Sequence, residues 1–463
     1  MHKALVCIVC IFIFGFPALP AQNLALSQEE TPTLQFWTTE TVPERVERTQ
    51  AIIDQFTAET GIEVNLVLTE QDEIDELIDT NFAAETLPDV IFHPLDFTQA
   101  WYAKGILDAD AATVAIQRMG EETFSALSLV SVAPGRYAAI PSDGWGQLLI
   151  YRKDLFDEAG LPAPTTFEQI EQAAATLHDP DNDLYGITAA TDPSEVFMQQ
   201  TFEHFALANG AQLTDGTGTV TLDTPEMIAA IAFYANLMAN YSPPAPECGI
   251  ICTRSIYLAG EAAMIVWSPF ILDELAGLRD SVPTTCPQCE ENPAFLAENS
   301  AVVPAFQGPL GTEPAQYGTI SSLGITTAAQ TDLATEFVEF WLNDGYLGWL
   351  ALSPEGKFPM RRGTPDDPDR FVRGWGQLET GVDRFSPLNA FYSDEVLTVL
   401  VEGATNFDRW GFSDGQGELV GAVYQELPIP TVLVDVIDGT ISAEEAAAEA
   451  QVWVEDLQSQ IER

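Results

Sequence analysis

Short apolar runs alternate with amphipathic segments over the first hundred residues, and this alternation constrains the fold more than any other feature. The runs Leu34–Trp37, Ile62–Leu68 and Asp89–Phe92 have the length and apolar character of strands. The segments between them repeat apolar residues at helical spacing. Strands joined by amphipathic helices predict an α/β fold with a mostly parallel sheet.

Polar and aromatic side chains follow two of these predicted strands. Trp37 and Glu40 come at the end of the first, and His93 and Asp96 follow the third. Ligands of open α/β sheets collect just outside the carboxyl ends of the strands. The four residues are therefore candidates for ligand contact, although core or surface packing is the alternative for any single tryptophan.

A further strand–helix unit lies in Ala139–Leu161. The apolar run Leu148–Tyr151 predicts a buried strand, and the turn before it carries Asp143 and Trp145. An acid beside an indole suits a polar ligand with apolar faces, because the ring stacks and the carboxylate accepts hydrogen bonds. A loop tryptophan folded back onto its own domain would give the same pattern, so these residues alone leave both interpretations open.

The same placement recurs after the apolar segment Ala262–Val266, which ends in the aromatic residues Trp267 and Phe270. Indole rings stack on the apolar faces of sugar rings, while nearby carboxylates accept hydrogen bonds from sugar hydroxyls. The recurrence after separate strands favours a ligand site over chance packing.

The amino terminus has the three parts of a secretory signal. Lys3 supplies a positive charge, Leu5–Phe16 is apolar, and small residues follow as far as Ala21. The apolar stretch is shorter than the roughly 20 residues that a membrane-spanning helix needs. We therefore predict a signal peptide within residues 1–25 and an exported protein, with an uncleaved amino-terminal anchor as the alternative.

The charge balance is strongly acidic, with 70 acidic against 18 basic residues and a formal net charge of −52. Nucleic acids and anionic lipids both need a basic footprint, so the balance argues against them as partners. A site for cations is one interpretation of the excess. A hydrated acidic surface, suited to a salty, acidic or hot exterior, is the interpretation that we favour.

Four cysteines lie beyond the predicted signal peptide, at Cys248, Cys252, Cys286 and Cys289. In an oxidising compartment they are expected to form two disulfides, for which three pairings are available. The spacing also resembles a zinc site. The pairs lie in proline-rich loops of an exported chain, so we favour disulfides, and either role is structural.

Motifs for catalysis and metal binding are weak. Gly411–Gly415 matches the G-x-S-x-G pattern of a nucleophile elbow, but no predicted strand precedes it and all four histidines come earlier in the chain. Asp179, Asp181 and Asp183 have the spacing of a calcium loop, yet the glycine and the glutamate that such a loop needs are absent. We therefore predict no enzymatic activity, no cofactor and no metal.

Local signals in the rest of the chain predict helix starts and one irregular region. Thr165 with Glu168 and Ser442 with Glu445 match the capping box of a helix start. Residues 280–317 are rich in proline, glycine and glutamate and predict loops. The carboxyl terminus is predicted to be helical.

Five segments occur in order along the chain: LQFWTTE, LPDVIFHPLDFTQAWYAKGIL, IPSDGWGQLLIYRKDLFDEAGLPAPTTFEQI, AGEAAMIVWSPF and YGTISSLGITTAAQTDLATEFVEFWL. Together they resemble the extracellular solute-binding proteins of ATP-driven importers, in the sugar-binding group that includes the maltodextrin-binding proteins. The resemblance covers roughly Leu34 to Leu457. The four loop cysteines and the long 280–317 segment depart from the pattern of the maltodextrin-binding proteins.

The resemblance implies an α/β, two-lobed, periplasmic-binding-protein-like fold of type II. Mixed sheets flanked by helices would form the two lobes, with a ligand cleft between them. Three hinge crossings would join the lobes at Pro141–Gly146, Thr319–Leu323 and Lys357–Arg361. The amino-terminal lobe would combine residues 30–141 with 322–355, and the carboxy-terminal lobe would combine 142–320 with 356–463.

The resemblance also implies a set of ligand contacts. The positions that match the family directly are Trp37, Glu40, His93, Asp96, Trp145 and Trp267. Further candidates, placed by their proximity to a crossing or to a late aromatic of the family, are Asp143, Phe270, Arg361, Trp375 and Trp410.

The function implied is that of the substrate-binding component of an ABC importer, outside the cytoplasmic membrane, in the periplasm or at the cell surface. A monomer would capture a sugar or oligosaccharide in the cleft and deliver it to the membrane permease. A non-sugar solute, such as a polyamine or an iron complex, is the main competing ligand, and the ammonium groups of a polyamine would suit Glu40, Asp96 and Asp143. A secreted enzyme on the same scaffold, or a surface adhesin or chemoreceptor accessory, would also be compatible with this fold.

Overall fold

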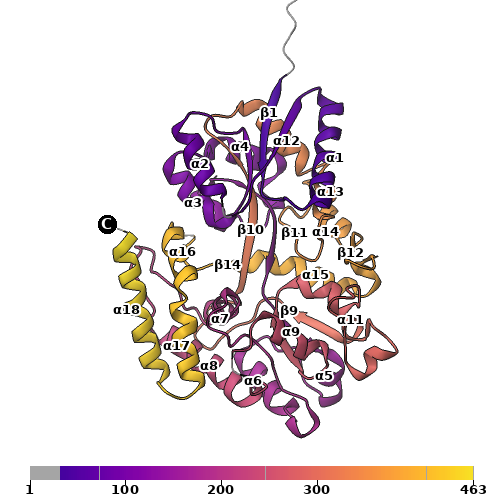
Figure 1. Ribbon diagram of the computed structural model, residues 1–463, viewed down its shortest axis with the longest axis vertical. Coiled ribbons are helices and arrows are strands. Elements are labelled where there is room, and N and C mark those ends of the chain that lie inside the picture. The colour runs from indigo at the N-terminus through magenta and orange to yellow at the C-terminus, as the bar shows by residue number, and fades with distance from the viewer. Residues whose placement is uncertain (1–31, 72, 246, 413, 462–463) are drawn as a thin grey trace, which may run out of the picture.

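The computed structural model describes residues 32–461 apart from residues 72, 246 and 413. The predicted signal peptide, residues 1–25, therefore lies outside the described residues. The chain forms an elongated molecule with two parts, one built around the amino-terminal strands and the other around a smaller sheet (Figure 1). We refer to these parts as the amino-terminal and carboxy-terminal lobes.

The larger sheet has seven strands in the order β11-β6-β10-β3-β1-β2, with β14 paired to β10. Its strands are β1 (Thr33–Thr38), β2 (Glu63–Leu68), β3 (Val90–Pro94), β6 (Ile140–Gly146), β10 (Gln316–Ile325), β11 (Phe358–Pro359) and β14 (Phe407–Asp408). β1 pairs in parallel with both β2 and β3. β10 pairs antiparallel with β3 and β6, so the sheet is mixed and not mostly parallel.

The antiparallel direction of β10 cannot be predicted from local sequence patterns. β10 enters the sheet from the carboxy-terminal lobe, whereas β1, β2 and β3 belong to successive strand–helix units (Figure 1). A strand that arrives from the other lobe runs in the opposite direction, and its pairing is set by distant contacts.

Helices of the amino-terminal lobe cover both faces of this sheet (Figure 1). They are α1 (Pro43–Thr60), α2 (Ile74–Ala83), α3 (Leu95–Lys104), α4 (Ala109–Met119), α12 (Thr331–Trp341) and α13 (Tyr346–Leu350). Phe36 of β1 lies 5.2 Å from Phe337 and 5.1 Å from Trp341, ring centroid to ring centroid. Each such buried aromatic stabilises the lobe by about 1.5–3 kcal/mol relative to an exposed one.

The carboxy-terminal lobe contains a three-stranded antiparallel sheet of order β8-β7-β9. Its strands are β7 (Leu148–Arg152), β8 (Met264–Trp267) and β9 (Ser300–Val303). The remaining α-helices of the described chain are α5 (Lys153–Ala159), α6 (Phe167–Leu177), α7 (Val196–Ala208), α8 (Pro225–Tyr241), α9 (Ile250–Leu258), α10 (Leu272–Leu275), α11 (Phe295–Asn299), α14 (Arg370–Trp375), α15 (Asp394–Gly403), α16 (Gly417–Glu426), α17 (Pro428–Ile437) and α18 (Ala443–Ile461). Of these, α14 packs on α13 of the amino-terminal lobe. The 280–317 region, predicted to be loops, therefore includes α11 and β9.

Two small hairpin-like pairs complete the strands. β4 (Ser131–Ala133) pairs with β5 (Arg136–Tyr137), and β12 (Glu379–Thr380) pairs with β13 (Ser386–Pro387). Within the described part of the chain, no single helix is long and apolar enough to cross a membrane, and the bent pair of α16 and α17 meets that criterion only when both helices are counted together.

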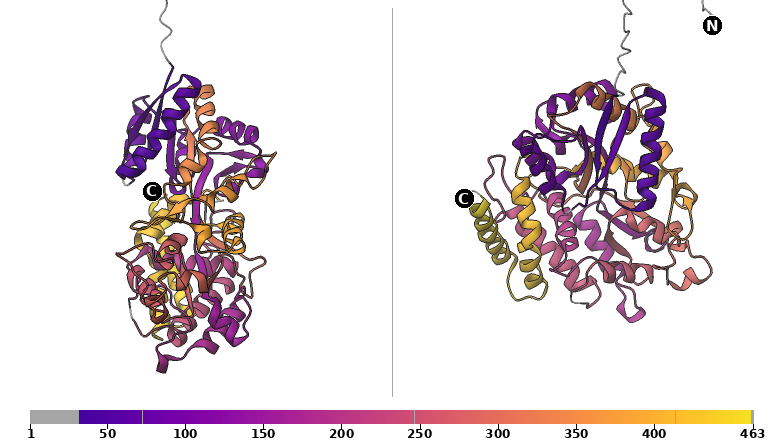
Figure 2. Two further views of the ribbon diagram at one scale, coloured as in Figure 1. Left: turned by 90° about the vertical axis from the view of Figure 1, so that its right-hand side faces the viewer. Right: turned by 45° about the horizontal axis from the view of Figure 1, so that its top comes forward.

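Three strands lie side by side where the two lobes meet. β10 runs through this junction, flanked by β6 and β14, while β11 pairs with the other edge of β6 (Figure 1). Figure 2 shows the same junction from the side, where the lobes stand apart on one face of the molecule. The three predicted crossings fall on β6, β10 and β11, and the lobe boundaries, 30–141 with 322–355 and 142–320 with 356–463, remain predictions.

Candidate functional site

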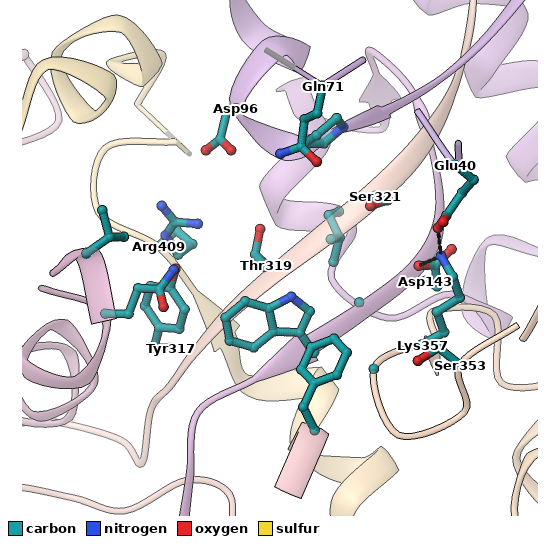
Figure 3. Close-up of a pocket in the computed structure, with 18 of the residues that line it drawn as sticks. Glu40, Gln71, Asp96, Asp143, Tyr317, Thr319, Ser321, Ser353, Lys357 and Arg409 are labelled. Atoms are coloured by element: carbon teal, nitrogen blue, oxygen red, sulfur yellow. Dashed lines mark hydrogen bonds and ion pairs between the residues drawn. The ribbon is translucent and has the colours of Figure 1, made fainter. Parts of the chain in front are cut away.

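A cavity of about 420 Å³ lies beside these central strands. Both lobes and the strands between them contribute side chains to it (Figure 3). Its lining comprises Glu40, Arg45, Gln71, Pro94, Asp96, Asp143, Gly144, Trp145, Val196, Gln200, Phe270, Tyr317, Thr319, Ile320, Ser321, Ser353, Gly356, Lys357, Arg409 and Tyr424.

A buried lysine closes one end of the cavity. The Nζ of Lys357 lies 2.7 Å from Oε1 of Glu40 and 3.2 Å from Oδ2 of Asp143. Its ammonium group also lies 4.4 Å from the ring centroid of Trp349. Arg45 supplies a second positive charge, with Nη1 2.9 Å from Oε2 of Glu40. The two carboxylates at this end are thus paired with two cations of the protein itself.

The pairing keeps Lys357 and Glu40 charged despite their burial. Burial alone would lower the pKa of Lys357, but the carboxylates of Asp143 and Glu40 raise it above its ordinary value. Burial would likewise raise the pKa of Glu40, but the charges of Lys357 and Arg45 lower it. The end of the cavity therefore holds a fixed, internally neutralised set of charges.

Asp143 is oriented by neighbours in the amino-terminal lobe and on its own strand. Its Oδ1 accepts hydrogen bonds from Nε1 of Trp349 at 2.5 Å and from the hydroxyl of Ser142 at 3.0 Å. Its Oδ2 faces Lys357. Both carboxylate oxygens are thus committed to protein donors.

Two aromatic rings line the middle of the cavity. Trp145 and Phe270 meet edge to face with ring centroids 6.1 Å apart, and Tyr317 lies 6.0 Å from Trp145. Thr319 and Ser321 of β10 place hydroxyl groups along the adjacent wall (Figure 3). The middle of the cavity therefore offers an apolar ring surface beside hydrogen-bonding groups.

The opposite end is built around Arg409. Its guanidinium carbon lies 4.7 Å from the ring centroid of Tyr317, 4.9 Å from that of Phe412 and 5.0 Å from that of Tyr424. The Nε of Arg409 is 3.3 Å from Oε1 of the fully buried Glu203. Asp96, at the start of α3, lines this end from the amino-terminal lobe (Figure 3).

Comparison with known proteins identifies the family. A family model described as bacterial extracellular solute-binding protein matches residues 42–347, which is more than half of the chain. The chain belongs to this family of solute-binding proteins. A relative from Escherichia coli K12, with the provisional name ABC transporter periplasmic-binding protein YcjN, is 30% identical over 416 residues, or 86% of this chain and 89% of the relative.

Solved structures share the fold at low sequence identity. The sugar-binding protein MalE from Xanthomonas citri matches 93% of this solute-binding protein and 98% of its own chain, with a TM-score of 0.71 and 19% identity. A solute-binding protein of an ABC transporter from Agrobacterium radiobacter K84, in complex with ribitol, matches 92% of this chain and 98% of its own, with a TM-score of 0.56 and 18% identity. These likenesses confirm the two-lobed fold of type II.

Membership of the family settles the general class of function. The chain is a solute-binding protein and not an enzyme, its ligand is a small molecule, and its partners are the permease subunits of an ABC transporter. The family is extracytoplasmic, so the protein is exported. Among the described residues, no group of three or more histidine, cysteine, aspartate or glutamate side chains could hold a metal ion.

Five of the residues proposed from sequence line the cavity of this solute-binding protein. They are Glu40, Asp96, Asp143, Trp145 and Phe270. The other six lie outside the cavity lining and pack into the lobes: Trp37, His93, Trp267, Arg361, Trp375 and Trp410.

Trp37 and His93 lie within strands and not beyond them. Trp37 belongs to β1, and its side chain packs with Ile91 and Trp101. His93 belongs to β3, is fully buried, and contacts the backbone oxygen of Pro94 through Nδ1 at 2.9 Å. Burial lowers the pKa of His93 to about 4. Residues inside a strand alternate between its faces, so proximity to the strand end does not place them in the cavity.

The three remaining tryptophans of this set are held in the core by their own polar groups or ring contacts. Trp267 packs edge to face on Phe197, with centroids 4.6 Å apart. Nε1 of Trp375 donates to the backbone oxygen of Pro354 at 2.8 Å. Nε1 of Trp410 donates to the backbone oxygen of Ala211 at 2.9 Å.

Arg361 joins two helix ends. Its Nη1 donates to the backbone oxygen of Leu342 at 2.7 Å and to Oδ1 of Asn343 at 2.6 Å, and its Nη2 donates to the backbone oxygen of Met119 at 3.1 Å. Cations near helix carboxyl ends satisfy unpaired carbonyl groups. Burial lowers the pKa of Arg361 to about 10. Its guanidinium group is therefore committed to α4 and α12.

Sequence reasoning missed both cations that define the ends of the cavity, Lys357 and Arg409. Lys357 lies at the start of the predicted third crossing, and Arg409 directly precedes the candidate Trp410. Basic residues are scarce in this chain, at 18 of 463. That scarcity is the signal that would have drawn attention to the two cations, because a rare charge that folding buries needs a partner or a role.

The four loop cysteines form two local disulfides. Cys248 bonds to Cys252, and Cys286 bonds to Cys289. Of the three pairings left open by the sequence, the structure has the one that joins nearest neighbours. The thiols are consumed in these bonds, so the zinc interpretation is not supported.

Proposed function

We propose that the protein captures a sugar or a sugar alcohol in the cavity between its lobes and delivers it to an ABC permease. The observation that carries the proposal is the surface formed by Trp145 and Phe270 beside the hydroxyl groups of Thr319 and Ser321. Such a surface suits a ligand with apolar ring or carbon faces and a rim of hydroxyl groups. The sugar-binding and ribitol-bound relatives support the same ligand class.

The charges of the cavity argue against a polyamine ligand. Glu40 and Asp143 would be the anions that bind an ammonium group, but the Nζ of Lys357 already lies between them. A second ammonium group there would face the positive charge of Lys357 at close range. A polyamine would thus meet a cation where the sequence led us to expect two unpaired acids.

Ligand contacts on both lobes would favour the closed form of the hinge. Asp96 comes from the amino-terminal lobe, whereas Phe270 and Arg409 come from the carboxy-terminal lobe. A solute that contacts both sides binds the closed form better than the open one and shifts the population toward it. The permease would then recognise the closed form. Signal cleavage within residues 1–25 and retention in the periplasm or at the cell surface belong to this proposal, as does action as a monomer.

A ligand screen tests the proposal. Melting temperature would be measured with glucose, galactose, maltose, mannitol, ribitol and putrescine, and each hit would be titrated by calorimetry. A neutral sugar or sugar alcohol at about 100 times its Kd should stabilise the protein by about 2.7 kcal/mol. Stabilisation by putrescine alone would contradict the proposal.

A matched pair of variants locates the binding surface. Trp145→Ala should weaken the binding of the hit by roughly tenfold to a hundredfold, because stacking area is lost. Trp453→Ala, on α18 and outside the cavity lining, makes the same change elsewhere and should leave binding unchanged. Equal losses in both variants would show that the effect comes from stability and not from contact.

A further inference from the structure

Arg409 is held in place on the side away from the cavity. Glu203, on α7, is completely buried and pairs with Nε of Arg409 at 3.3 Å. Glu203 also accepts hydrogen bonds from the hydroxyl of Tyr424 at 2.6 Å and from the backbone N–H of Trp410 at 2.9 Å. The rings of Tyr317 and Phe412 complete the enclosure. The guanidinium group therefore has one position, and a carboxylate already compensates its charge.

Asp96 faces Arg409 from the other lobe. It is solvent-exposed at the first turn of α3, and its carboxylate lies across the cavity end from the guanidinium group (Figure 3). The field of Asp96 acts on Arg409, yet no ion pair within 4.0 Å joins these two described side chains. Between them lies a space with a hydrogen-bond donor on one side and an acceptor on the other.

The sign of the charge in this space decides what can fill it. One guanidinium group stands between two carboxylates, those of Glu203 and Asp96, so an additional anion meets uncompensated negative charge. Adjacent hydroxyl groups meet no such penalty. One hydroxyl can accept from Arg409 while its neighbour donates to Asp96. A neutral diol thus matches both sides at once.

We infer that Arg409 and Asp96 together determine specificity by holding adjacent hydroxyl groups of an uncharged solute and excluding analogues that carry a carboxylate or a phosphate. The inference rests on the proposed function and deepens it, since it selects among sugars by charge. Arg409 contributes the donor from a fixed position, and Asp96 contributes both the acceptor and the repulsion of anions. Because the two residues belong to different lobes, the same diol also links the lobes.

Three matched pairs of neutral and acidic probes test the inference. Glucose with glucuronate, galactose with galacturonate, and ribitol with ribonate share their secondary hydroxyl groups and differ at one terminal carbon, where a carboxylate replaces a hydroxymethyl group. Calorimetric titrations of the wild type should show tighter binding of a neutral member than of its acidic partner. In Asp96→Asn, neutral binding should weaken while the preference over the acidic partner shrinks by roughly tenfold, because the repelling charge is gone.

A control separates this effect from the overall charge of the molecule. Asp110→Asn makes the same chemical change on the surface, where the Asp110 side chain is 82% exposed, and it should leave the preference unchanged. Arg409→Lys retains the charge and loses the planar fork, so it should weaken neutral binding without inverting the preference. Because Arg409 is buried, Asp96→Asn carries the test if the lysine variant does not fold.

Each outcome has a distinct meaning. An unchanged preference in Asp96→Asn, a wild type that prefers the acidic partners, or no binding by any of the three pairs would overturn the inference. If another neutral sugar or sugar alcohol of the wider screen still binds in these cases, the proposed function stands. Failure of every neutral compound in that screen would overturn the proposed function itself.

Discussion

Lys357 neutralises two acidic residues that the sequence suggested as ligand contacts. Glu40 and Asp143 were identified from sequence as acids beside a ligand site, and both line the cavity. Their negative charges are already paired within the protein, because the Nζ of Lys357 lies 2.7 Å from Oε1 of Glu40 and 3.2 Å from Oδ2 of Asp143. The lysine arrives from a segment more than 200 residues along the chain, so local patterns could not reveal the pairing.

Substitution of Lys357 should reveal how much its ion pairs contribute to stability. Lys357→Ala leaves two buried carboxylates without their shared cation and should destabilise the protein by about 3–5 kcal/mol. Ethylammonium can occupy the space of the missing side chain and should raise the melting temperature of the variant more than that of the wild type. Lys357→Met fills the space without a charge and serves as the control. An equal response of both variants to ethylammonium would contradict the account.

Arg361 should behave differently from the cavity residues. Arg361→Lys loses part of the hydrogen bonding to the ends of α4 and α12, which should cost about 1–3 kcal/mol of stability. The guanidinium group lies outside the cavity lining, so the Kd of a bound sugar should change by less than roughly twofold. Urea unfolding and calorimetry measure the two effects. If Arg361→Lys lost affinity for the sugar without losing stability, Arg361 would instead be a ligand contact.

Of the candidates near the ends of β1 and β3, those that lie beyond the strand line the cavity, whereas those within the strand do not. Asp96 lies past the end of β3 at Pro94, and Glu40 lies past the end of β1 at Thr38; both line the cavity. Trp37 and His93 still belong to these strands, where alternation sends side chains to opposite faces. A sequence pattern fixes a strand end only to within a residue or two, and that margin is enough to move a side chain from the cavity into the core.

Elements with purely local signals were predicted well. The capping box of Ser442 and Glu445 is present, with Ser442 N–H donating to Glu445 at 2.8 Å and the Glu445 N–H donating to Ser442 Oγ at 3.2 Å. The box predicted at Thr165 and Glu168 lies one residue later, because Thr166 caps α6 and accepts from the N–H of Gln169 at 3.3 Å. The pairing of β10 between β3 and β6 depends on contacts between distant segments, and sequence patterns do not encode it.

The short helix α10 should make stability depend on pH. Burial raises the pKa of Asp273 to about 6 and that of Glu274 to about 7, although Arg279 and Arg254 oppose these shifts. An acid with a raised folded-state pKa contributes stability below its unfolded value and loses it as pH rises through the folded value. Glu355 adds to the negative charge near Asp273. Stability should therefore decline between about pH 5 and pH 7.

Glu274→Gln tests this dependence by imitating the protonated acid. The variant should be more stable than the wild type at pH 8, by roughly 1–2 kcal/mol, and close to it at pH 5. Thermal unfolding across this range measures the difference. Glu291→Gln, at an exposed position, is the control for removal of one charge. Parallel pH profiles for the wild type and Glu274→Gln would show that the carboxyl group does not titrate there.

At the scale of the whole molecule, the two lobes are joined by a few central strands. The lobes meet at β6, β10 and β11, and they stand apart on one face (Figure 2). The resemblance to the family, carried by the order of five segments, predicted this architecture from sequence. The exact position of the lobe boundaries and the direction of the acidic side chains did not follow from it, because both depend on how the crossings pack.

Ligand binding should make the molecule more compact. Small-angle scattering with a saturating sugar or sugar alcohol from the screen should give a smaller radius of gyration than the free protein, because contacts on both lobes favour the closed form. At the same concentration, the same compound should decrease the radius of Trp145→Ala less than that of the wild type, because the variant binds more weakly. Moderate salt is required, since a net charge of −52 causes strong repulsion between molecules. An unchanged radius at proven saturation would contradict hinge closure.

The position of Trp145 gives the protein an optical reporter of its own. All nine tryptophans lie within the described residues, and Trp145 is the one that lines the cavity. Most of the others are buried in the lobes, where a solute cannot contact them. Direct contact with a solute in the cavity should therefore change the emission of this indole ring most. Trp145→Phe would keep an aromatic surface in the cavity and silence the signal.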